Sequence, residues 1–285
     1  YDDDIPQYDE DIERFSAALQ EHAYDPASGY FSYVLHDDSG RPVAPLRHES
    51  GTNYNMGLDG AYGLVAGICT TQQTERLLSF LTDEKRLWTE IGLSTVDRSA
   101  PYYRMDGYWN GAVWFPHQWF FFKTCLDLGR PDIARKIALT ALEVWETEVE
   151  RSYNCYEHFI IETRRGAGWH QFSGLSTPVL LWHGAYREAG RLTFGFDVWL
   201  TSGVEHSGGG CTASLQTLGS SSGGPVTGLY RGTPDAEYHV TFDGAAVPTR
   251  IDPDGVVSFN LPRKRSGTLA ISRLTSPRRD SMTSA

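Results

Sequence analysis

The sequence predicts a mainly α-helical fold of paired helices, of the α/α-barrel or toroid type, followed by a small β-sandwich-like C-terminal module. Apolar helix-like stretches occupy much of the first 190 residues, and short turns join the expected helices into pairs. After Arg191 extended runs such as LTFGFDVWL alternate with Gly, Ser, Pro and Asp. We expect domains over 1–190 and 191–275, and a disordered tail over 276–285.

Helical periodicity begins near the amino terminus. Ile12, Phe15 and Leu19 share one face of a helix expected over 8–22. The alternating YFSYV, between two turn signals, predicts a strand or hairpin over 24–34. Thr70 or Thr71 is a suitable residue to open a helix, with Glu75 in its first turn. The other expected helices cover 58–68, 71–81, 110–128, 131–150 and 175–189, with Gly129 and Gly190 as terminators.

Composition narrows the class of partner. The 285 residues include 36 acidic and 25 basic side chains, a net charge of −11, which disfavours nucleic acids and anionic membranes. No apolar run approaches a membrane span, and the first residues lack the features of a signal peptide, so we expect a cytoplasmic location. The chain starts without Met, which indicates processing or a fragment. The four cysteines show no CxxC spacing, and we expect no cofactor.

A tryptophan-rich stretch, MDGYWNGAVWFPHQW, has the residue types that bind sugars. Aromatic faces pack on the C–H faces of pyranose rings, and amide groups hydrogen-bond hydroxyls. Phe120, Phe121 and Phe122 are expected in the core instead. The substrate-binding residues predicted from this stretch are Tyr108, Trp109, Asn110 and Trp114.

Glu157 is the carboxylate with the most suggestive neighbours. A hydrolase that uses water needs one carboxylate to accept a water proton and a second carboxylic acid to protonate the leaving oxygen. Glu157 can be the first, although a single Glu is more often a solvated surface charge. The polar and aromatic neighbours expected to bind substrate with it are His158, Trp169, His170 and Gln171.

Other kinds of site lack the required spacing. His117, His158 and His170 form no zinc-binding pattern, so no metal is expected. Neither Ser173 nor Ser202 lies in a G-x-S-x-G nucleophile elbow.

Four stretches carry a family resemblance: YDPASGYFSYV; GLDGAYGLVAGICTTQQTERLLSFL with LWTEIGLSTV; GYWNGAVWFPHQWFFFKTCLDLG; and YEHF with GAGWHQFSGLSTPVLLW. Over about residues 25–182 the chain resembles glycoside hydrolase family 63 and the related mannosylglycerate-hydrolase-like enzymes, which include α-glucosidases and mannosyl-oligosaccharide glucosidase. The resemblance implies an (α/α)6 barrel, inversion of the anomeric centre, Glu157 as general base, and a sugar site that includes Tyr108, Trp109, Asn110 and Trp114. Many relatives have Arg where this chain has Asn110.

The same resemblance locates the general acid elsewhere. In the family it is an Asp in a tryptophan-rich motif that precedes the stretch matching 58–68, and this sequence contains no such motif. We therefore expect only the C-terminal half of the barrel here, with the acid upstream. Asp59 and Asp106 are the alternatives within the chain, each better explained as a helix-start or structural carboxylate.

The predicted function is an inverting exo-α-glycosidase, of α-glucosidase or α-mannosidase type, that acts on oligosaccharides or small glycosides. The alternative is a catalytically incomplete carbohydrate-binding or scaffold remnant, and a lyase or epimerase is disfavoured because no basic cluster is evident. For the β module we favour capping of the barrel over glycan binding, for which Trp199, Tyr230 and Tyr238 would be the aromatic platforms. The sequence predicts no oligomeric state.

Overall fold

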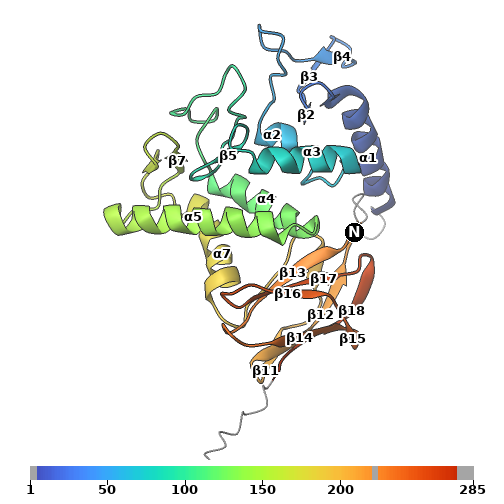
Figure 1. Cartoon of the computed structure of the whole chain (residues 1–285). Coiled ribbons are helices and arrows are strands. Elements are labelled where there is room, and N and C mark those ends of the chain that lie inside the picture. The colour runs from blue at the N-terminus through green and yellow to red at the C-terminus, as the bar shows by residue number, and fades with distance from the viewer. Residues whose placement is uncertain (1–4, 220–223, 275–285) are drawn as a thin grey trace, which may run out of the picture. The chain divides into compact units, whose positions relative to one another are not determined.

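A computed structural model of the chain describes residues 5–219 and 224–274 (Figure 1). These residues form two compact units. The first contains 5–124 and 133–179, and the second contains 125–132, 180–219 and 224–274. The tail expected over 276–285 lies outside the described residues.

The prediction of a mainly α fold built from helical hairpins of the (α/α)6-toroid type is wrong, since the structure is 32% helix and 28% strand. The segments that join the helices of the first unit, which we expected mostly as turns, pair with themselves as short antiparallel hairpins. They are β1 (Tyr24–Asp25) with β2 (Tyr30–Phe31), β3 (Val34–His36) with β4 (Pro42–Pro45), β5 (Trp88–Thr89) with β6 (Gly92–Leu93), and β7 (His158–Ile160) with β8 (Arg165–Ala167).

The helices are α1 (Ile5–Ala18), its π-helical extension η2 (Leu19–Ala23), α2 (Leu58–Ala61), α3 (Thr71–Thr82), α4 (Phe115–Asp127), α5 (Pro131–Ser152), α6 (Ser173–Ser176) and α7 (Pro178–Arg187). The expected α3 and α5 are confirmed within a few residues. Thr70 opens α3 with a capping box, and its partner is Gln73. The helix expected over 175–189 is instead divided between α6 and α7.

Two expected helices are shorter than their apolar pattern predicts. Only Leu58–Ala61 of the stretch 58–68 is helical, because its glycines lower helix propensity and Gly67 turns the chain with φ +67°. The helix expected from residue 110 begins at Phe115, because the preceding residues form turns and Val113 pairs with Phe159 as an isolated bridge.

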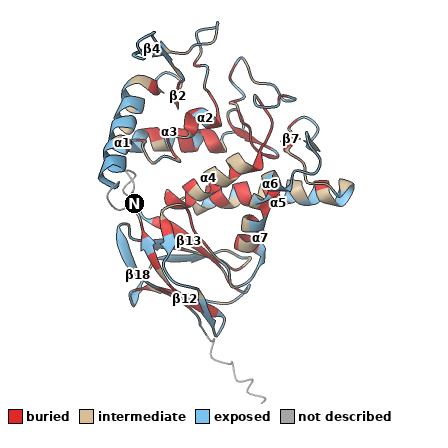
Figure 2. Ribbon diagram, turned by 180° about the vertical axis from the view of Figure 1, so that it is seen from behind, coloured by how far each residue is buried: buried red, intermediate tan, exposed pale blue. Residues whose placement is uncertain are grey.

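Helices α4 and α5 contribute to the buried core of the first unit and lie side by side in both ribbon views (Figures 1 and 2). Phe121 and Phe122 are fully buried, as expected, and Phe120 is half-buried. Pro131 begins α5 just after Gly129 closes α4 with φ +69°.

Helix α1 has an apolar stripe that remains on the surface. Its members are between 43% and 62% exposed, and Figure 2 shows α1 in pale blue along nearly its whole length. No residue of α1 is buried. The stripe consists of Ile5, Tyr8, Ile12 and Phe15, continued by Leu19 of η2.

The second unit contains two antiparallel sheets. One has the order β10 (Val198–Leu200), β12 (Gly210–Thr217), β18 (Arg265–Arg273), β14 (Tyr238–Phe242) and β15 (Ala245–Ala246), with β11 (Glu205–Ser207) also on β12. The other has the order β16 (Thr249–Ile251), β17 (Val256–Leu261), β13 (Val226–Arg231) and β9 (Leu192–Thr193). Alternate residues of the two sheets enter one apolar cluster, which buries Tyr230 and Tyr238, whereas Trp199 is exposed.

The last turn of α4 belongs to the second unit. The Asp127 carboxylate accepts the backbone N–H groups of Phe196 (2.7 Å) and Asp197 (3.0 Å), and burial raises the pKa of Asp127 to about 7. Arg263 donates to the Asp127 backbone oxygen and to the Asp197 carboxylate. Gly195 permits this approach, since a Cβ there would lie 1.9 Å from Oδ1 of Asp127.

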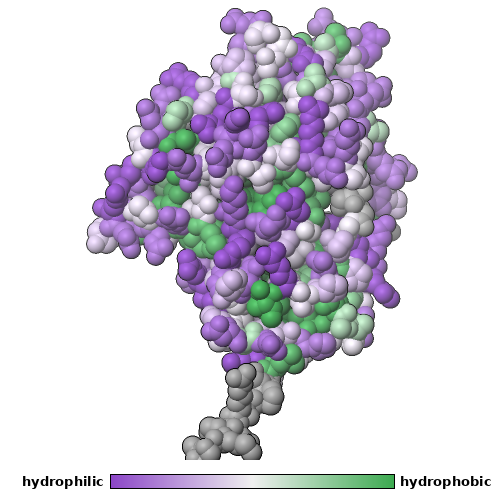
Figure 3. Space-filling model, viewed as in Figure 1, coloured by the Kyte–Doolittle hydropathy of each residue, from purple (hydrophilic) through white to green (hydrophobic). Residues whose placement is uncertain are grey.

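Hydrophilic side chains cover much of the face seen in Figure 3, with smaller hydrophobic areas between them. Within residues 5–219 and 224–274, none of the helices has the length and apolar character needed to cross a membrane.

Candidate functional site

The Glu157 carboxylate is fixed by two hydrogen bonds. The Tyr108 hydroxyl donates to Oε1, and the Trp169 backbone N–H donates to Oε2 at 3.2 Å. The side chain is 18% exposed, so it remains in contact with solvent. The Tyr108 hydrogen bond is the main cause that lowers the pKa of Glu157 below its ordinary value. Glu157 is therefore an ionised acceptor at neutral pH.

The hairpin β7–β8 explains this position. Glu157 precedes β7 and Trp169 follows β8, and their backbones also pair through the Glu157 N–H and the Trp169 oxygen at 3.1 Å. Gly168 has φ +77°, and a Cβ there would lie 2.2 Å from Oε2 of Glu157. Only glycine lets the chain approach the carboxylate this closely.

The hairpin is attached to α5 by an ion pair between the buried Glu148 and the more exposed Arg165. Arg165 of β8 donates two hydrogen bonds to the Glu148 carboxylate, at 2.7 and 3.0 Å, and the Gly166 N–H adds a third at 2.9 Å. These hydrogen bonds, first that of Arg165, lower the pKa of Glu148 to about 2.

His158 lies behind the carboxylate. Its ring stacks on Trp114 at 5.0 Å and meets the Tyr108 ring edge-on at 4.9 Å. Burial lowers the pKa of His158, so the ring is neutral at pH 7. Its Nδ1 is 4.0 Å from Oε2 of Glu157 and has no hydrogen-bond partner among the described residues.

Trp109 and Trp114 continue the stack toward solvent. Their rings are 4.0 Å apart and nearly parallel, with an interplanar angle of 7°. Trp114 is 3% exposed and donates its indole N–H to the backbone oxygen of Tyr108, whereas Trp109 is 55% exposed. Trp109 therefore presents an aromatic surface, and Trp114 supports it.

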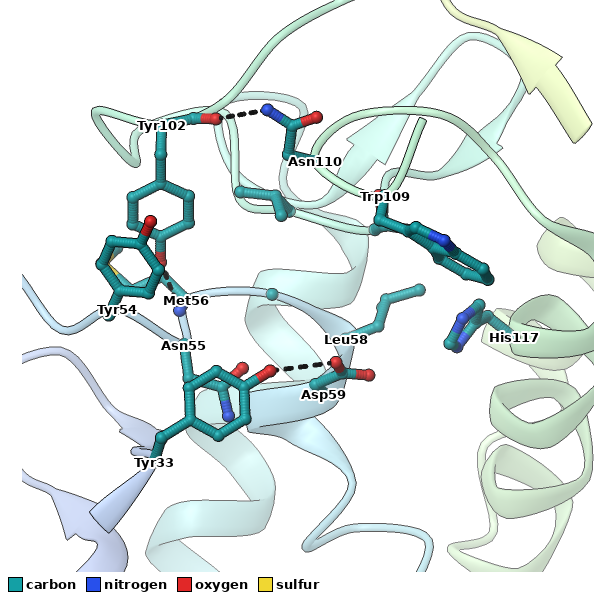
Figure 4. Close-up of a pocket in the computed structure, with 13 residues that line it drawn as sticks. Tyr33, Tyr54, Asn55, Met56, Leu58, Asp59, Tyr102, Trp109, Asn110 and His117 are labelled. Carbon is teal, nitrogen blue, oxygen red and sulfur yellow. Dashed lines mark hydrogen bonds between the residues drawn. The ribbon is translucent and has the colours of Figure 1, made fainter. Parts of the chain in front are cut away.

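A cavity of about 440 Å³ lies beside Trp109, within the usual range for ligand sites (Figure 4). Trp109 and His117 lie on one side of it, and Tyr54 and Tyr102 on the other. The lining consists of Tyr33, Tyr54, Asn55, Met56, Gly57, Leu58, Asp59, Thr95, Val96, Tyr102, Trp109, Asn110 and His117.

Two hydrogen-bonded pairs shape the polar part of the cavity. The Tyr33 hydroxyl donates to Oδ2 of Asp59 at 3.2 Å, and the Tyr62 hydroxyl lies 2.9 Å from Nδ1 of His117. Burial lowers the pKa of His117, which makes this imidazole neutral at pH 7.

The predicted site residues fall into three groups. Tyr108, Trp114, His158 and Trp169 surround Glu157, and Trp109 and Asn110 line the cavity. Asn110 donates its amide to the Tyr102 backbone oxygen at 3.0 Å. His170 and Gln171 are exposed, and Gln171 pairs through its backbone with Cys155.

The two alternative acids differ in position. Asp59 lines the cavity, whereas Asp106 is exposed in an ion pair with Arg104 at 3.1 Å. In the part of the chain that the structure describes, no three His, Cys, Asp or Glu side chains are grouped as metal ligands.

Sequence reasoning missed the tyrosines of the cavity, Tyr33, Tyr54 and Tyr102. They come from separate segments with no shared motif. The turn-flanked YFSYV was the one local signal near any of them, and it indicates a strand rather than a ligand contact.

Residues 2–173 match the family model of the mannosylglycerate hydrolase MGH1-like glycoside hydrolase domain. The chain belongs to this family. A mannosylglycerate hydrolase from Thermus thermophilus is 30% identical over 107 residues, which are 36% of this chain and 25% of that protein. The chain thus spans about a quarter of that relative's length.

Solved structures give similar partial matches. A family 63 mannosylglycerate hydrolase from Thermus thermophilus, in complex with Tris and D-glycerate, matches with 23% identity and a TM-score of 0.48, over 61% of this chain and 38% of that one. A neutral trehalase from Saccharomyces cerevisiae matches with 15% identity and a TM-score of 0.42, over 59% of this chain and 28% of that one.

Proposed function

We propose that this chain supplies the water-activating half of a glycoside hydrolase site, with Glu157 as the general base of an inverting, exo-acting α-glycosidase. The observation that carries the proposal is the setting of Glu157, an ionised carboxylate held by Tyr108 and the Trp169 N–H beside an exposed tryptophan. Family membership supports glycoside chemistry. The substrates proposed are small α-glucosides or α-mannosides.

The proposed reaction is a single displacement. Glu157 takes a proton from a water molecule while the water oxygen bonds to the anomeric carbon and the glycosidic C–O bond breaks on the opposite face. A second carboxylic acid, about 6.5–9.5 Å from the first, gives its proton to the leaving oxygen. We assign that acid to a residue outside this sequence, because Asp106 is ion-paired with Arg104 and the described contacts leave Asp59 a recognition role.

A substrate whose leaving group needs no protonation isolates the base. α-Glucosyl and α-mannosyl fluorides release fluoride, a weak base, so Glu157 alone should support their hydrolysis. Glu157→Gln is expected to slow release of fluoride by roughly 10²–10⁴-fold. Glu143→Gln, at an exposed position of α5, is the matched control. NMR of the first product should show the β-anomer, and an α-product or an active Glu157→Gln variant would refute the assignment.

Carbohydrate binding without turnover is the second candidate. It is favoured by one observation: Glu157 is not among the residues that line the cavity beside Trp109. Calorimetric binding of a methyl α-glycoside, with no fluoride release from the corresponding glycosyl fluoride, would support binding alone.

A further inference from the structure

Asp59 is the one carboxylate among the residues that line the described cavity, and no Arg or Lys lines it. Its neighbour His117 is kept neutral by burial, which lowers the pKa of the imidazole. The cavity therefore carries a single negative charge that no lining cation offsets.

The carboxylate has hydrogen-bonding capacity left for a ligand. A carboxylate accepts at about four lone-pair positions, and Tyr33 uses one of them on Oδ2. No described residue donates to Oδ1. His117 uses Nδ1 with Tyr62, which leaves its second ring nitrogen for another partner. Hydroxyl groups are suited to both positions, because a hydroxyl can donate to the carboxylate and can also accept or donate at imidazole.

The aromatic walls fit a ring with apolar C–H faces. Trp109 presents an exposed indole on one side of the cavity. Tyr54 and Tyr102 lie on the other side (Figure 4). Their rings stack at 5.0 Å, and His48 stacks on Tyr54 at 5.8 Å. Flat aromatic surfaces with a polar edge between them match a pyranose, whose faces are apolar and whose rim carries hydroxyls.

We propose that this cavity is a subsite for an uncharged, hydroxyl-rich ring, in which Asp59 receives ligand hydroxyls and rejects carboxylate-bearing sugars. The proposal rests on the proposed glycosidase function and names the substrate class of that site. Rejection follows because a ligand carboxylate near Asp59 would place two like charges together without an intervening cation. An amino sugar, in contrast, would be attracted.

Binding to the chain measured by calorimetry tests the proposal without turnover. The probes are methyl α-D-glucopyranoside and two analogues in which its C6 hydroxymethyl group is replaced by a carboxylate (the uronide) or by an aminomethyl group. We expect the neutral glucoside to bind at least roughly 10-fold more tightly than the uronide. Asp59→Asn keeps the size of the side chain. It should weaken binding of the neutral glucoside several-fold and bring the ratio of the affinities for the neutral glucoside and the uronide close to one. Asp38→Asn, an exposed position outside the lining, should leave both affinities unchanged.

A second measurement needs no substitution. Raising the salt from about 0.1 M to about 1 M shortens the Debye length from about 10 Å to about 3 Å, so the discrimination against the uronide should shrink. The proposal is overturned if the uronide binds as tightly as the neutral glucoside, if Asp59→Asn keeps the ratio, or if none of the probes binds. Glu157→Gln should retain the ratio, so an error in the assignment of the base would not be mistaken for an error here.

Discussion

The hydroxyl of Tyr108 donates a hydrogen bond to Oε1 of Glu157 across 49 residues of sequence. It joins the turn that precedes α4 to the segment that precedes β7. The same tyrosine accepts the Trp114 indole N–H through its backbone oxygen. Tyr108 thus orients the proposed base and supports the tryptophan beneath Trp109.

Removal of the Tyr108 hydroxyl should change the pH dependence of catalysis. Tyr108→Phe takes away the main cause of the lowered pKa of Glu157, so that pKa rises. The base is active when ionised, and the acid limb of the kcat/KM profile should therefore move to higher pH, with roughly 10-fold lower kcat/KM at its plateau. A profile of unchanged shape would contradict the role given to this hydrogen bond. Tyr103→Phe, at a tyrosine outside both the cavity lining and the contacts of Glu157, is the control.

Substitutions of the two stacked tryptophans should have different effects, one on ligand affinity and the other on the free energy of unfolding. Trp109→Ala removes an exposed ring and should weaken methyl α-glycoside binding roughly 10-fold with little change in the free energy of unfolding. Trp114→Ala empties a buried site and should cost about 3–5 kcal/mol of that free energy. Chemical denaturation and calorimetry on both variants check this, and equal destabilisation by the two would be the contrary result.

The Glu148–Arg165 pair should contribute stability that depends on pH. The pKa of Glu148 is about 2 in the folded chain and near 4.5 in the unfolded chain, so the unfolded state takes up the proton first as pH falls. Its stabilisation is fully present above the unfolded pKa and is lost as the pH falls toward 2. Glu148→Gln should lower the free energy of unfolding by about 1 kcal/mol at neutral pH, because its charge-assisted hydrogen bonds with the partly exposed Arg165 are weakened, and by much less near pH 2. Urea unfolding of the wild type and the variant between neutral pH and pH 2 measures this effect. If the difference in their free energies of unfolding did not change with pH, the ion pair would not be its cause.

The surface stripe of α1 should tolerate substitution. Phe15→Ala should change the free energy of unfolding by less than about 0.5 kcal/mol, because the ring is already exposed. Phe121→Ala, the same change at a fully buried site of α4, should cost about 3–5 kcal/mol. A loss for Phe15→Ala near that of Phe121→Ala would mean that the stripe is covered in solution.

Local signals predicted the helices whose ends are set locally. Thr70 caps α3 and Pro131 begins α5, and both helices lie where the sequence predicts them. The start of α4 differs because Val113 pairs with Phe159, a tertiary contact that overrides the apolar pattern of the stretch. Likewise the amphipathic pattern of α1 predicted a helix correctly, but could not predict that the apolar side would be exposed.

The candidate site was also predictable only where local sequence signals exist. The residue types of the Trp109 and Glu157 stretches indicated sugar chemistry, and the structure brings Tyr108 of the first stretch to Glu157 of the second. The Tyr33–Asp59 pair joins residues 26 positions apart and has no spacing rule to reveal it. Only the folded chain shows that the two residues share a cavity.

The contact between Arg263 and the end of α4 limits how early in synthesis the last turn of α4 can reach its native contacts. The Asp127 backbone oxygen receives its guanidinium donor from a residue 136 positions later. During synthesis on the ribosome, nearly all of the second unit must be made before the Asp127 backbone oxygen can accept this hydrogen bond. Chains that stop short of Arg263 would leave Asp197 and the Asp127 carbonyl without the cation, so a nonsense or frameshift change just before the codon for Arg263 should destabilise the last turn of α4.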